Sequence, residues 1–184
     1  SDGAGATVGC SAQQTTILTG ALAAAGPLAT QAQQYMNNVP VGRRATNARY
    51  VTWFGTYVAT RYTGVASLYG NIAGAATGQV DFDCTGAGRC NGVPVSCDPD
   101  DYAFTCASGT TTIWPCAAFW TAPATGEDSK PGTIVHELSH WFGTDDYEYS
   151  CSDCQALANR NANRAVKNAD NCQYFAENFG LTCQ

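Results

Sequence analysis

Two long stretches in the first half of the chain have the apolar pattern of helices that pack against a core. Residues 11–38 are rich in alanine, glutamine, leucine and threonine, which predicts a helix interrupted at Gly26-Pro27. Between Thr46 and Ile72, aromatic and aliphatic residues recur every three or four positions, which predicts an amphipathic helix. Core packing alone explains these apolar residues, so both helices are expected to be scaffold.

The middle of the chain has a different pattern. Residues 79–84 alternate polar and apolar side chains, which is typical of a strand. Residues 85–101 are dense in glycine, cysteine, proline and aspartate, which predicts a loop. Residues 110–119 predict a further strand or two, and Pro115 is allowed there only at a sheet edge, because proline donates no ladder hydrogen bond.

The last part of the chain returns to helical patterns. Residues 154–167 are helical by composition, and a short last helix is expected to extend through Asn178. Repeats, low-complexity segments and linkers are absent from the sequence. These elements predict an α+β fold, mainly helical with a small antiparallel sheet, in a single domain of residues 1–184.

Composition narrows the cellular setting and the partners. Ten cysteines in 184 residues indicate an oxidising compartment and five disulfides. The chain opens without a positively charged leader, so we expect a secreted, mature product from which a signal peptide and a propeptide have been removed. A net charge of −6 and a pI near 4.6 argue against nucleic acid or an anionic membrane as partner. No apolar run is long enough to span a bilayer, and we expect a monomer.

Both histidines of the chain lie in one short motif, His136-Glu-Leu-Ser-His140. Ser129 or Asp128 can cap a helix here, and on a helix two residues four apart lie on the same face. Both imidazoles can then bind one zinc ion, while Glu137 leans toward the open side of the ion as a general base. The alternative is coincidence, in which two core histidines happen to share a face.

A third protein ligand is needed, because a catalytic zinc usually has three ligands and a water. The nearby candidates are Asp145, Asp146 and Glu148, which follow a turn that can bring the chain back toward the metal. Cys151 and Cys154 could instead complete a closed Cys₂His₂ structural site. In such a site the two histidines would precede the two cysteines, which inverts the usual zinc-finger order, and Glu137 would have no role.

The histidine motif and the residues after it resemble a known signature. HELSH followed by Gly-Thr-Asp-Asp-Tyr-Glu-Tyr at residues 143–149 is similar to the aspzincin signature, HExxH with a downstream GTxDxxYG. That family comprises deuterolysins and peptidyl-Lys metalloendopeptidases, which are secreted fungal proteases, and its final glycine is Ser150 here. Five further stretches resemble the peptidyl-Lys branch: residues 49–55, 82–84, 118–123, 125–129 and 168–171 with Tyr174-Phe175.

The resemblance implies a zincin-like metalloprotease domain with one Zn²⁺ per chain. His136, His140 and Asp146 would bind the metal, Glu137 would be the catalytic base, and Tyr149 would lie beside the reacting carbonyl. Protein or peptide substrates are then expected. An extended peptide could pair with an open edge formed by residues 112–118, which include Trp114 and Ala117, unless a loop covers that edge.

The resemblance also implies part of the disulfide pattern. Cys10 would pair with Cys84, and the region of Cys90 with Cys116. Cys97 and Cys106 would then close a hairpin. The remaining four cysteines would tie down the last helices in a pairing that stays open: Cys151, Cys154, Cys172 and Cys183.

Substrate preference depends on two positions near the end of the chain. Lysine-specific relatives have acidic residues near the position of Asp170 and three positions later, where this chain has Gln173. One carboxylate attracts an ammonium group less strongly than two, so we expect a preference for lysine on the leaving-group side (P1′) rather than strict specificity. A helix cap or surface acid is the alternative for Asp170, and broad deuterolysin-like cleavage is the alternative specificity.

Two other classes of protein remain compatible with the sequence. One is a secreted zinc-binding protein that keeps the fold without catalysis. The other is a disulfide-rich surface or adhesion module in which the histidine motif is accidental. Zinc content and chelator-sensitive proteolysis distinguish both from an enzyme.

Overall fold

The computed structural model describes residues 4–178 and 180–183. The first three residues, on which the expectation of a mature N-terminus rests, lie outside this part. Seven of the helices are α1 (Ala12–Asn38), α2 (Ala48–Phe54), α3 (Ala59–Ala76), α4 (Ala117–Thr121), α5 (Lys130–His140), α6 (Cys151–Arg160) and α8 (Ala169–Glu177). A 3₁₀ helix (Val41–Thr46) and the short α7 (Ala162–Ala165) connect them. The strands are β1 (Ala4–Val8), β2 (Val80–Asp83), β3 (Ala87–Cys90), β4 (Val93–Ser96), β5 (Ala103–Thr105) and β6 (Thr112–Pro115).

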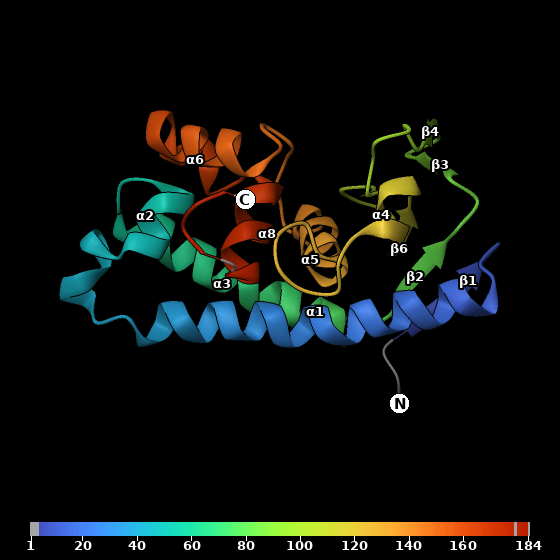
Figure 1. Cartoon of the computed structure of the whole chain (residues 1–184), viewed down its shortest axis with the longest axis horizontal. Helices are drawn as coiled ribbons and strands as arrows, with labels where there is room; N and C mark the ends of the chain where they lie inside the picture. Colours follow the sequence, from blue (N-terminus) through green and yellow to red (C-terminus); the bar gives the residue numbers. More distant parts are fainter. Residues whose placement is uncertain (1–3, 179, 184) are drawn as a thin grey trace.

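The long helix α1 runs along one side of the molecule, and α3 packs against it (Figure 1). The predicted interruption at Gly26-Pro27 is wrong, because Pro27 lies inside an unbroken helix. Half of the buried residues of α1 are alanines, and a Cβ at Gly26 would be in van der Waals contact with Cβ of Ala76 in α3, at 3.5 Å. An interior proline costs a helix roughly 3 kcal/mol, and packing of α1 against α3 and α5 is the tertiary context that can override this local cost.

The predicted helix from Thr46 to Ile72 is also wrong, because it is divided into α2 and α3. The break is at Gly55, whose φ of 74° lies in the region that favours glycine. A Cβ at this position would lie 2.2 Å from the carbonyl oxygen of Ala158 in α6. Contact between α2 and α6 therefore requires glycine here, and periodicity alone does not reveal that contact.

The predicted fold class, α+β and mainly helical, is confirmed. The strands form a four-stranded sheet in the order β1-β2-β6-β5 and a separate hairpin of β3 and β4. The β1–β2 and β2–β6 pairs are parallel and the β5–β6 pair is antiparallel, so the larger sheet is mixed rather than antiparallel. The strand predicted at 79–84 is confirmed as β2, whereas the one predicted to Phe119 ends at Pro115, where the chain turns into α4.

The segment predicted as a loop, residues 85–101, contains the β3–β4 hairpin. Its turn is Asn91-Gly92, and both residues have positive φ, 52° and 84°. Asn-Gly is the strongest short signal for a two-residue hairpin turn. The hairpin was therefore predictable from this dipeptide, which the high glycine and cysteine content obscured.

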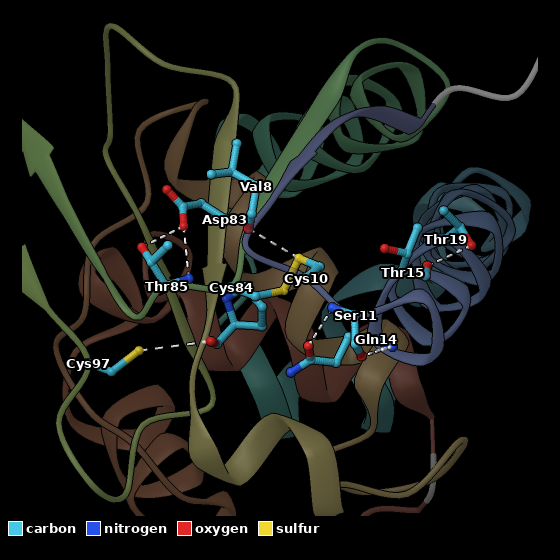
Figure 2. Close-up of a disulfide and its surroundings, with 11 residues drawn as sticks. Val8, Cys10, Ser11, Gln14, Thr15, Thr19, Asp83, Cys84, Thr85 and Cys97 are labelled. Carbon is cyan, nitrogen blue, oxygen red and sulfur yellow. Dashed lines mark hydrogen bonds between the residues drawn. A yellow bond between two sulfur atoms is a disulfide. The ribbon is translucent and has the colours of Figure 1, made fainter.

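Four disulfides are formed, and the expected Cys10–Cys84 bridge is confirmed. Figure 2 shows this bridge joining the segment between β1 and α1 to the end of β2. The expected arrangement, with Cys116 bridged to the region of Cys90 and Cys97 to Cys106, is wrong; the observed pairs are Cys90–Cys106 and Cys97–Cys116. The unpredicted hairpin is the cause, because it places Cys90 beside its turn and Cys97 just beyond its open end.

The last four cysteines form one bridge rather than two. Cys151 pairs with Cys183, whereas Cys154 and Cys172 are free and buried, so the expected fifth disulfide is wrong. The Cys154 thiol instead accepts a hydrogen bond from the side-chain nitrogen of Asn168 at 3.4 Å. Its environment is therefore part of the packed interior between α6 and α8.

Helix α5 lies between the helical part of the molecule and the sheet (Figure 1). It packs against α1, α3 and α8 on one side and against β5 on the other. Aromatic side chains fill the interior beside it, among them Trp53, Tyr69, Phe82 and Phe175, each fully buried. None of the described helices is both long and apolar enough to cross a membrane.

Candidate metal centre and active site

Helix α5 carries the histidine motif, and its ends are fixed by local sequence. The Ser129 side chain accepts a hydrogen bond from the backbone nitrogen of Gly132, so of the two predicted caps Ser129 is the one that is used. Pro131 lies in the first turn, as predicted. At the other end Trp141 donates its indole hydrogen to Thr105 Oγ1 at 3.0 Å, which ties the helix to β5.

Three side chains bring their ligand atoms together at the end of α5. The Nε2 atoms of His136 and His140 are 3.2 Å apart. Asp146 Oδ1 lies 3.3 Å from Nε2 of His136 and 3.5 Å from Nε2 of His140. Ligands about 2.0–2.1 Å from a tetrahedral zinc ion are themselves separated by about 3.3 Å, so this triangle has the size that zinc requires.

Hydrogen bonds on the other ring nitrogens show what this triangle can bind. Nδ1 of His136 lies 2.6 Å from Asp170 Oδ1, and Nδ1 of His140 lies 3.2 Å from the carbonyl oxygen of Thr144. Both partners are acceptors, so each Nδ1 carries the hydrogen and each neutral ring presents a lone pair at Nε2. Two lone pairs and the carboxylate of Asp146 thus face one another, an arrangement that a cation between them stabilises.

The electrostatics of the site agree with this assignment. Burial lowers the pKa of His136, but hydrogen bonds and charge from Asp146 and Asp170 outweigh burial and raise it well above its ordinary value. Burial also lowers the pKa of His140, but the hydrogen bond and charge of Asp146 outweigh burial, so this pKa is raised as well. The surrounding carboxylates therefore favour positive charge at this point, whether it is a proton or a metal ion.

The loop that carries Asp146 is held by the segment before α8. Gly143 has a φ of 91° and lets the chain turn back after α5. Asp145 then donates its backbone nitrogen to the carbonyl oxygen of Lys167 at 2.8 Å and accepts from the nitrogen of Ala169 at 3.1 Å. These two bonds fix the position of Asp146, the next residue along.

Asn168, which is fully buried, fixes the rest of this loop. Its side-chain oxygen accepts from the backbone nitrogens of Tyr147 and Glu148 at 2.7 and 3.1 Å. Its side-chain nitrogen donates to the carbonyl oxygen of Glu148 at 2.8 Å. One side chain thus replaces the backbone partners that a strand would have supplied.

The other candidate ligands lie elsewhere or have other partners. The Asp145 carboxylate accepts from the backbone nitrogen of Asp146, and Glu148 pairs with Arg160. Cys151 is in a disulfide, and Cys154 is buried beside Asn168. The closed Cys₂His₂ site is therefore contradicted, and among the described residues the group that could hold a metal is His136, His140 and Asp146.

Glu137 and Tyr149 lie beside this group and line the same cavity. Glu137 is buried, its Oε1 is 4.0 Å from Nε2 of His136, and its Oε2 has no hydrogen-bond partner among the described residues. Burial raises the pKa of Glu137. The Tyr149 side chain is 61% exposed overall. Partial burial and the nearby Asp146 carboxylate raise the pKa of Tyr149 to about 12, so its hydroxyl keeps its hydrogen.

A cavity of about 650 Å³ opens onto these residues. Its far side is formed by residues 98–105, which include the edge strand β5. The predicted binding edge at residues 112–118 is wrong, because β6 lies between β2 and β5 inside the sheet. Trp114 stacks on Phe104 and lies under Gly88 of the hairpin, and neither Trp114 nor Ala117 lines the cavity.

Asp170 and Gln173 of α8, the predicted substrate-binding residues, both line the cavity. Asp170 is 8% exposed and uses Oδ1 to hold His136. Gln173 is 5% exposed, and its side-chain nitrogen lies 3.3 Å from Glu177 Oε1 and 3.5 Å from Asp128 Oδ1. Asp170 therefore has a contact to the metal site that the sequence did not indicate.

A family model described as lysine-specific metallo-endopeptidase, aspzincin, matches residues 42–177. The chain belongs to the aspzincin family. The match includes every residue of the candidate metal centre as well as Asp170 and Gln173 of α8. The resemblance that the histidine motif and residues 143–149 indicated is thus confirmed.

Individual aspzincin relatives agree. The chain is 40% identical over 174 residues to a peptidyl-Lys metalloendopeptidase of Pleurotus ostreatus, covering 93% of this chain and 95% of that protein. It is 39% identical to one from Armillaria mellea and 36% identical to an extracellular protease of Aeromonas hydrophila, over 92% of this chain in each case. It spans about half the length of those two relatives, 45% and 46%. A solved structure, a zinc peptidase from Grifola frondosa, superposes with a TM-score of 0.80 at 34% identity, covering 92% of this chain and 97% of that one.

This aspzincin departs from the family signature at its last position, where Ser150 replaces glycine. Ser150 has φ 65° and ψ 151°, a conformation that is essentially restricted to glycine. Its side chain accepts a hydrogen bond from the backbone nitrogen of Asp153 and thereby caps α6. The chain thus has a glycine-type backbone conformation at this position, and the serine adds a cap at the cost of strain.

Proposed function

We propose that the chain, as a single domain of residues 1–184 and a monomer, is a secreted zinc-dependent endopeptidase. The observation that carries this proposal is the triangle of His136, His140 and Asp146, with the buried carboxylate of Glu137 beside it. Three ligand atoms at zinc spacing and an unpaired base next to them suit hydrolysis rather than structural metal binding. Family membership and the names of the relatives support the same activity.

A zinc ion held by the three ligands would supply a Lewis acid that activates a water and polarises the peptide carbonyl. Glu137 takes the proton from the attacking water and delivers it to the leaving amine. Tyr149, whose hydroxyl keeps its hydrogen, donates a hydrogen bond to the carbonyl oxygen as negative charge develops there. Asp170 holds the hydrogen on Nδ1 of His136 and so keeps Nε2 available to the metal.

The substrate binds along β5. Its residues 103–105 line the cavity at one edge of the sheet, and an extended peptide can pair with a free edge through main-chain hydrogen bonds. The peptide then passes between this strand and α5, with its scissile carbonyl near Glu137 and Tyr149. Asp170 and Gln173 line the part of the cavity that would receive the side chain following the scissile bond, for which we propose a preference for lysine.

Two observations support secretion. Four disulfides suit an oxidising compartment, and the Aeromonas relative is named an extracellular protease. Among the three relatives reported above, the two fungal ones are named peptidyl-Lys enzymes, which supports the preference for lysine on the leaving-group side. Broad, deuterolysin-like cleavage is the second candidate, and Gln173 in place of an acid is the observation that favours it.

Casein hydrolysis with and without a chelator tests the activity. We expect one zinc per chain by elemental analysis, hydrolysis that stops with 1,10-phenanthroline, and recovery when zinc is added back. Stoichiometric zinc without hydrolysis would indicate a non-catalytic zinc-binding protein. Absence of both zinc and hydrolysis would indicate a surface module with an accidental motif.

Mass spectrometry of the fragments from a denatured protein tests the specificity. We expect most cuts to precede lysine, with a minority before other residues. Cuts spread evenly over residue types would remove the lysine preference and leave the peptidase proposal intact.

A further inference from the structure

The acid-lined part of the cavity is built from two segments, the start of α5 and the middle of α8. Asp128, Asp170, Gln173 and Tyr174 all line it. The Tyr174 hydroxyl donates to Asp128 Oδ1 at 2.9 Å, and the side-chain nitrogen of Gln173 lies 3.5 Å from the same oxygen. The Gln173 amide is thus directed at the protein's own acids, Asp128 and Glu177, rather than free to meet a substrate.

Asp128 is held firmly in this position. Its φ of 52° is unusual for a residue other than glycine, although aspartate and asparagine tolerate it better than most. Its backbone nitrogen donates to Glu177 Oε2 at 3.2 Å, and the next residue, Ser129, donates both its backbone nitrogen and its hydroxyl to Glu177 Oε1. Strained residues that the surrounding structure fixes so completely cluster at functional sites.

The cavity is strongly acidic. No lysine or arginine occurs among the described residues that line it, whereas seven acids do: Asp98, Asp100, Asp101, Asp128, Glu137, Asp146 and Asp170. Burial raises the pKa of Asp128, and the charge of Asp170 adds to that effect, while the hydrogen bond from Tyr174 opposes it. Asp170 contacts the His136 ring through one oxygen, but no lysine or arginine among the described lining residues accompanies either carboxylate, so a cation from outside stabilises the two acids.

We propose that Asp128, rather than residue 173, supplies the second carboxylate that, together with Asp170, binds the ammonium group of a lysine side chain at P1′. This inference rests on the proposed endopeptidase function and makes its lysine preference more specific. Asp170 engages His136 through Oδ1, so its other oxygen and Asp128 Oδ2 are the acceptors offered to the three hydrogens of an ammonium group. Gln173 then acts through Asp128, as a neutral donor that holds the carboxylate in place.

The test compares two peptides that differ only after the scissile bond, one with lysine and one with the uncharged, similarly long norleucine. In D128N, asparagine tolerates the positive φ and keeps an oxygen for the Tyr174 hydroxyl, but the charge is lost. We expect the ratio of kcat/KM for lysine over norleucine to fall about tenfold or more, since hydrogen bonds to charged groups are the stronger ones, while norleucine cleavage stays unchanged.

D100N is the matched control, because Asp100 lines the same cavity at an exposed position and loses the same charge. We expect this variant to change the ratio less than twofold at 0.15 M salt, where exposed charges are largely screened. An equal fall in D100N and D128N would overturn the inference in favour of a general field effect. An unchanged ratio in D128N would overturn it directly.

Binding supplies a readout that does not depend on turnover. In the E137Q background, we expect D128N to weaken binding of the lysine peptide by about the same factor, with no effect on the norleucine peptide. If D128N does not fold, Tyr174→Phe removes the hydroxyl that holds Asp128, and we expect a drop of about threefold in the lysine-to-norleucine ratio. No drop in that variant would contradict the proposal.

The wild-type enzyme separates this inference from the function on which it rests. Cleavage of neither peptide would contradict the peptidase function itself. Equal cleavage of both would keep the peptidase and overturn the lysine preference together with the role of Asp128. A wild-type preference for lysine that survives in D128N would overturn only the role of Asp128.

Discussion

The two sides of the cavity are built in different ways. The helical wall, formed by α5, α8 and the loop at residues 141–149, contains buried polar side chains that are hydrogen-bonded to partners within the wall. His136 with Asp170 and His140 with Thr144 are examples. The strand wall, residues 98–105, offers exposed acids and a strand edge and is tied down by the Cys90–Cys106 and Cys97–Cys116 bridges.

This difference assigns separate tasks to the two walls. Catalytic groups need fixed positions, and buried hydrogen-bond networks provide them. A strand edge that pairs with a peptide needs only a fixed backbone course. Disulfides that close short loops can fix the backbone without a large hydrophobic core. Changes in the helical wall should therefore affect metal content and kcat, whereas changes in the strand wall should affect stability and KM.

The largest expected effect is that of Glu137→Ala in the helical wall. Loss of the general base should lower kcat by about 10²–10⁴-fold, because proton transfer then depends on solvent. Zinc content should stay at one per chain, since Glu137 is not one of the three grouped ligand atoms. Kinetics on a peptide substrate together with elemental analysis check both parts, and turnover at the wild-type rate would remove Glu137 from the mechanism.

Asp146→Ala should cost the metal, and with it most of the activity, because two histidines alone leave the site one ligand short. Asp145→Ala is the control: its neighbouring carboxylate accepts a backbone hydrogen bond and lies outside the ligand group. Zinc titration with a competing chelator measures the difference. A loss of zinc in the Asp145 variant alone would exchange the two assignments.

Asp170→Asn tests the connection between the metal site and α8. Asparagine keeps the shape but weakens the hydrogen bond to Nδ1 of His136, so zinc affinity should fall about 10–100-fold. The same chelator competition measures it. An unchanged affinity would mean that Asp170 serves the substrate alone.

In the strand wall, replacing Cys97 and Cys116 together by serine should lower the free energy of unfolding by about 3 kcal/mol, as expected for a closed loop of 19 residues. KM should rise while zinc content and kcat change little, because the helical wall is untouched. Thermal unfolding and steady-state kinetics check this. A selective fall in kcat would show that the two walls are not independent.

The smallest effect is expected at Ser150, which follows the loop of the helical wall and also lines the cavity. Ser150→Gly should stabilise the chain by about 1 kcal/mol, because glycine adopts φ 65°, ψ 151° without strain, while exchanging a serine cap for glycine costs only a few tenths. A rise of a few degrees in Tm is the expected result. A lower Tm would mean that the cap outweighs the strain.

The helical wall was predictable to the extent that its chemistry is local. His136, Glu137 and His140 lie within one turn or so of a single helix, so spacing alone places them together. Asp146 follows a turn only a few residues later, which left three acids as candidates. The selection of Asp146 depends on the hydrogen bonds of its neighbour Asp145 with the backbones of Lys167 and Ala169, which are distant in sequence and which no local pattern indicates.

The strand wall was not predictable because its contacts are long-range. The sequence indicated a strand near Trp114, but not that β5 would pair outside it and take over the open edge. The disulfide prediction failed for a different, local reason: the hairpin turn at Asn91-Gly92, which decides which cysteines can meet, was overlooked. Asn168 is a buried polar residue whose role appears only once the loop beside it is placed.

The short bridge between Asp145 and Asn168 joins two parts of the centre that lie far apart in sequence. Asp146, the third candidate ligand, directly follows Asp145. Asp170, whose carboxylate orients His136, comes two residues after Asn168. A shift of this bridge would therefore move both groups at once, and a loosened metal would be accompanied by a distorted lysine pocket. Metal occupancy and substrate choice in this protein should accordingly vary together, because both depend on the position of this one β-bridge.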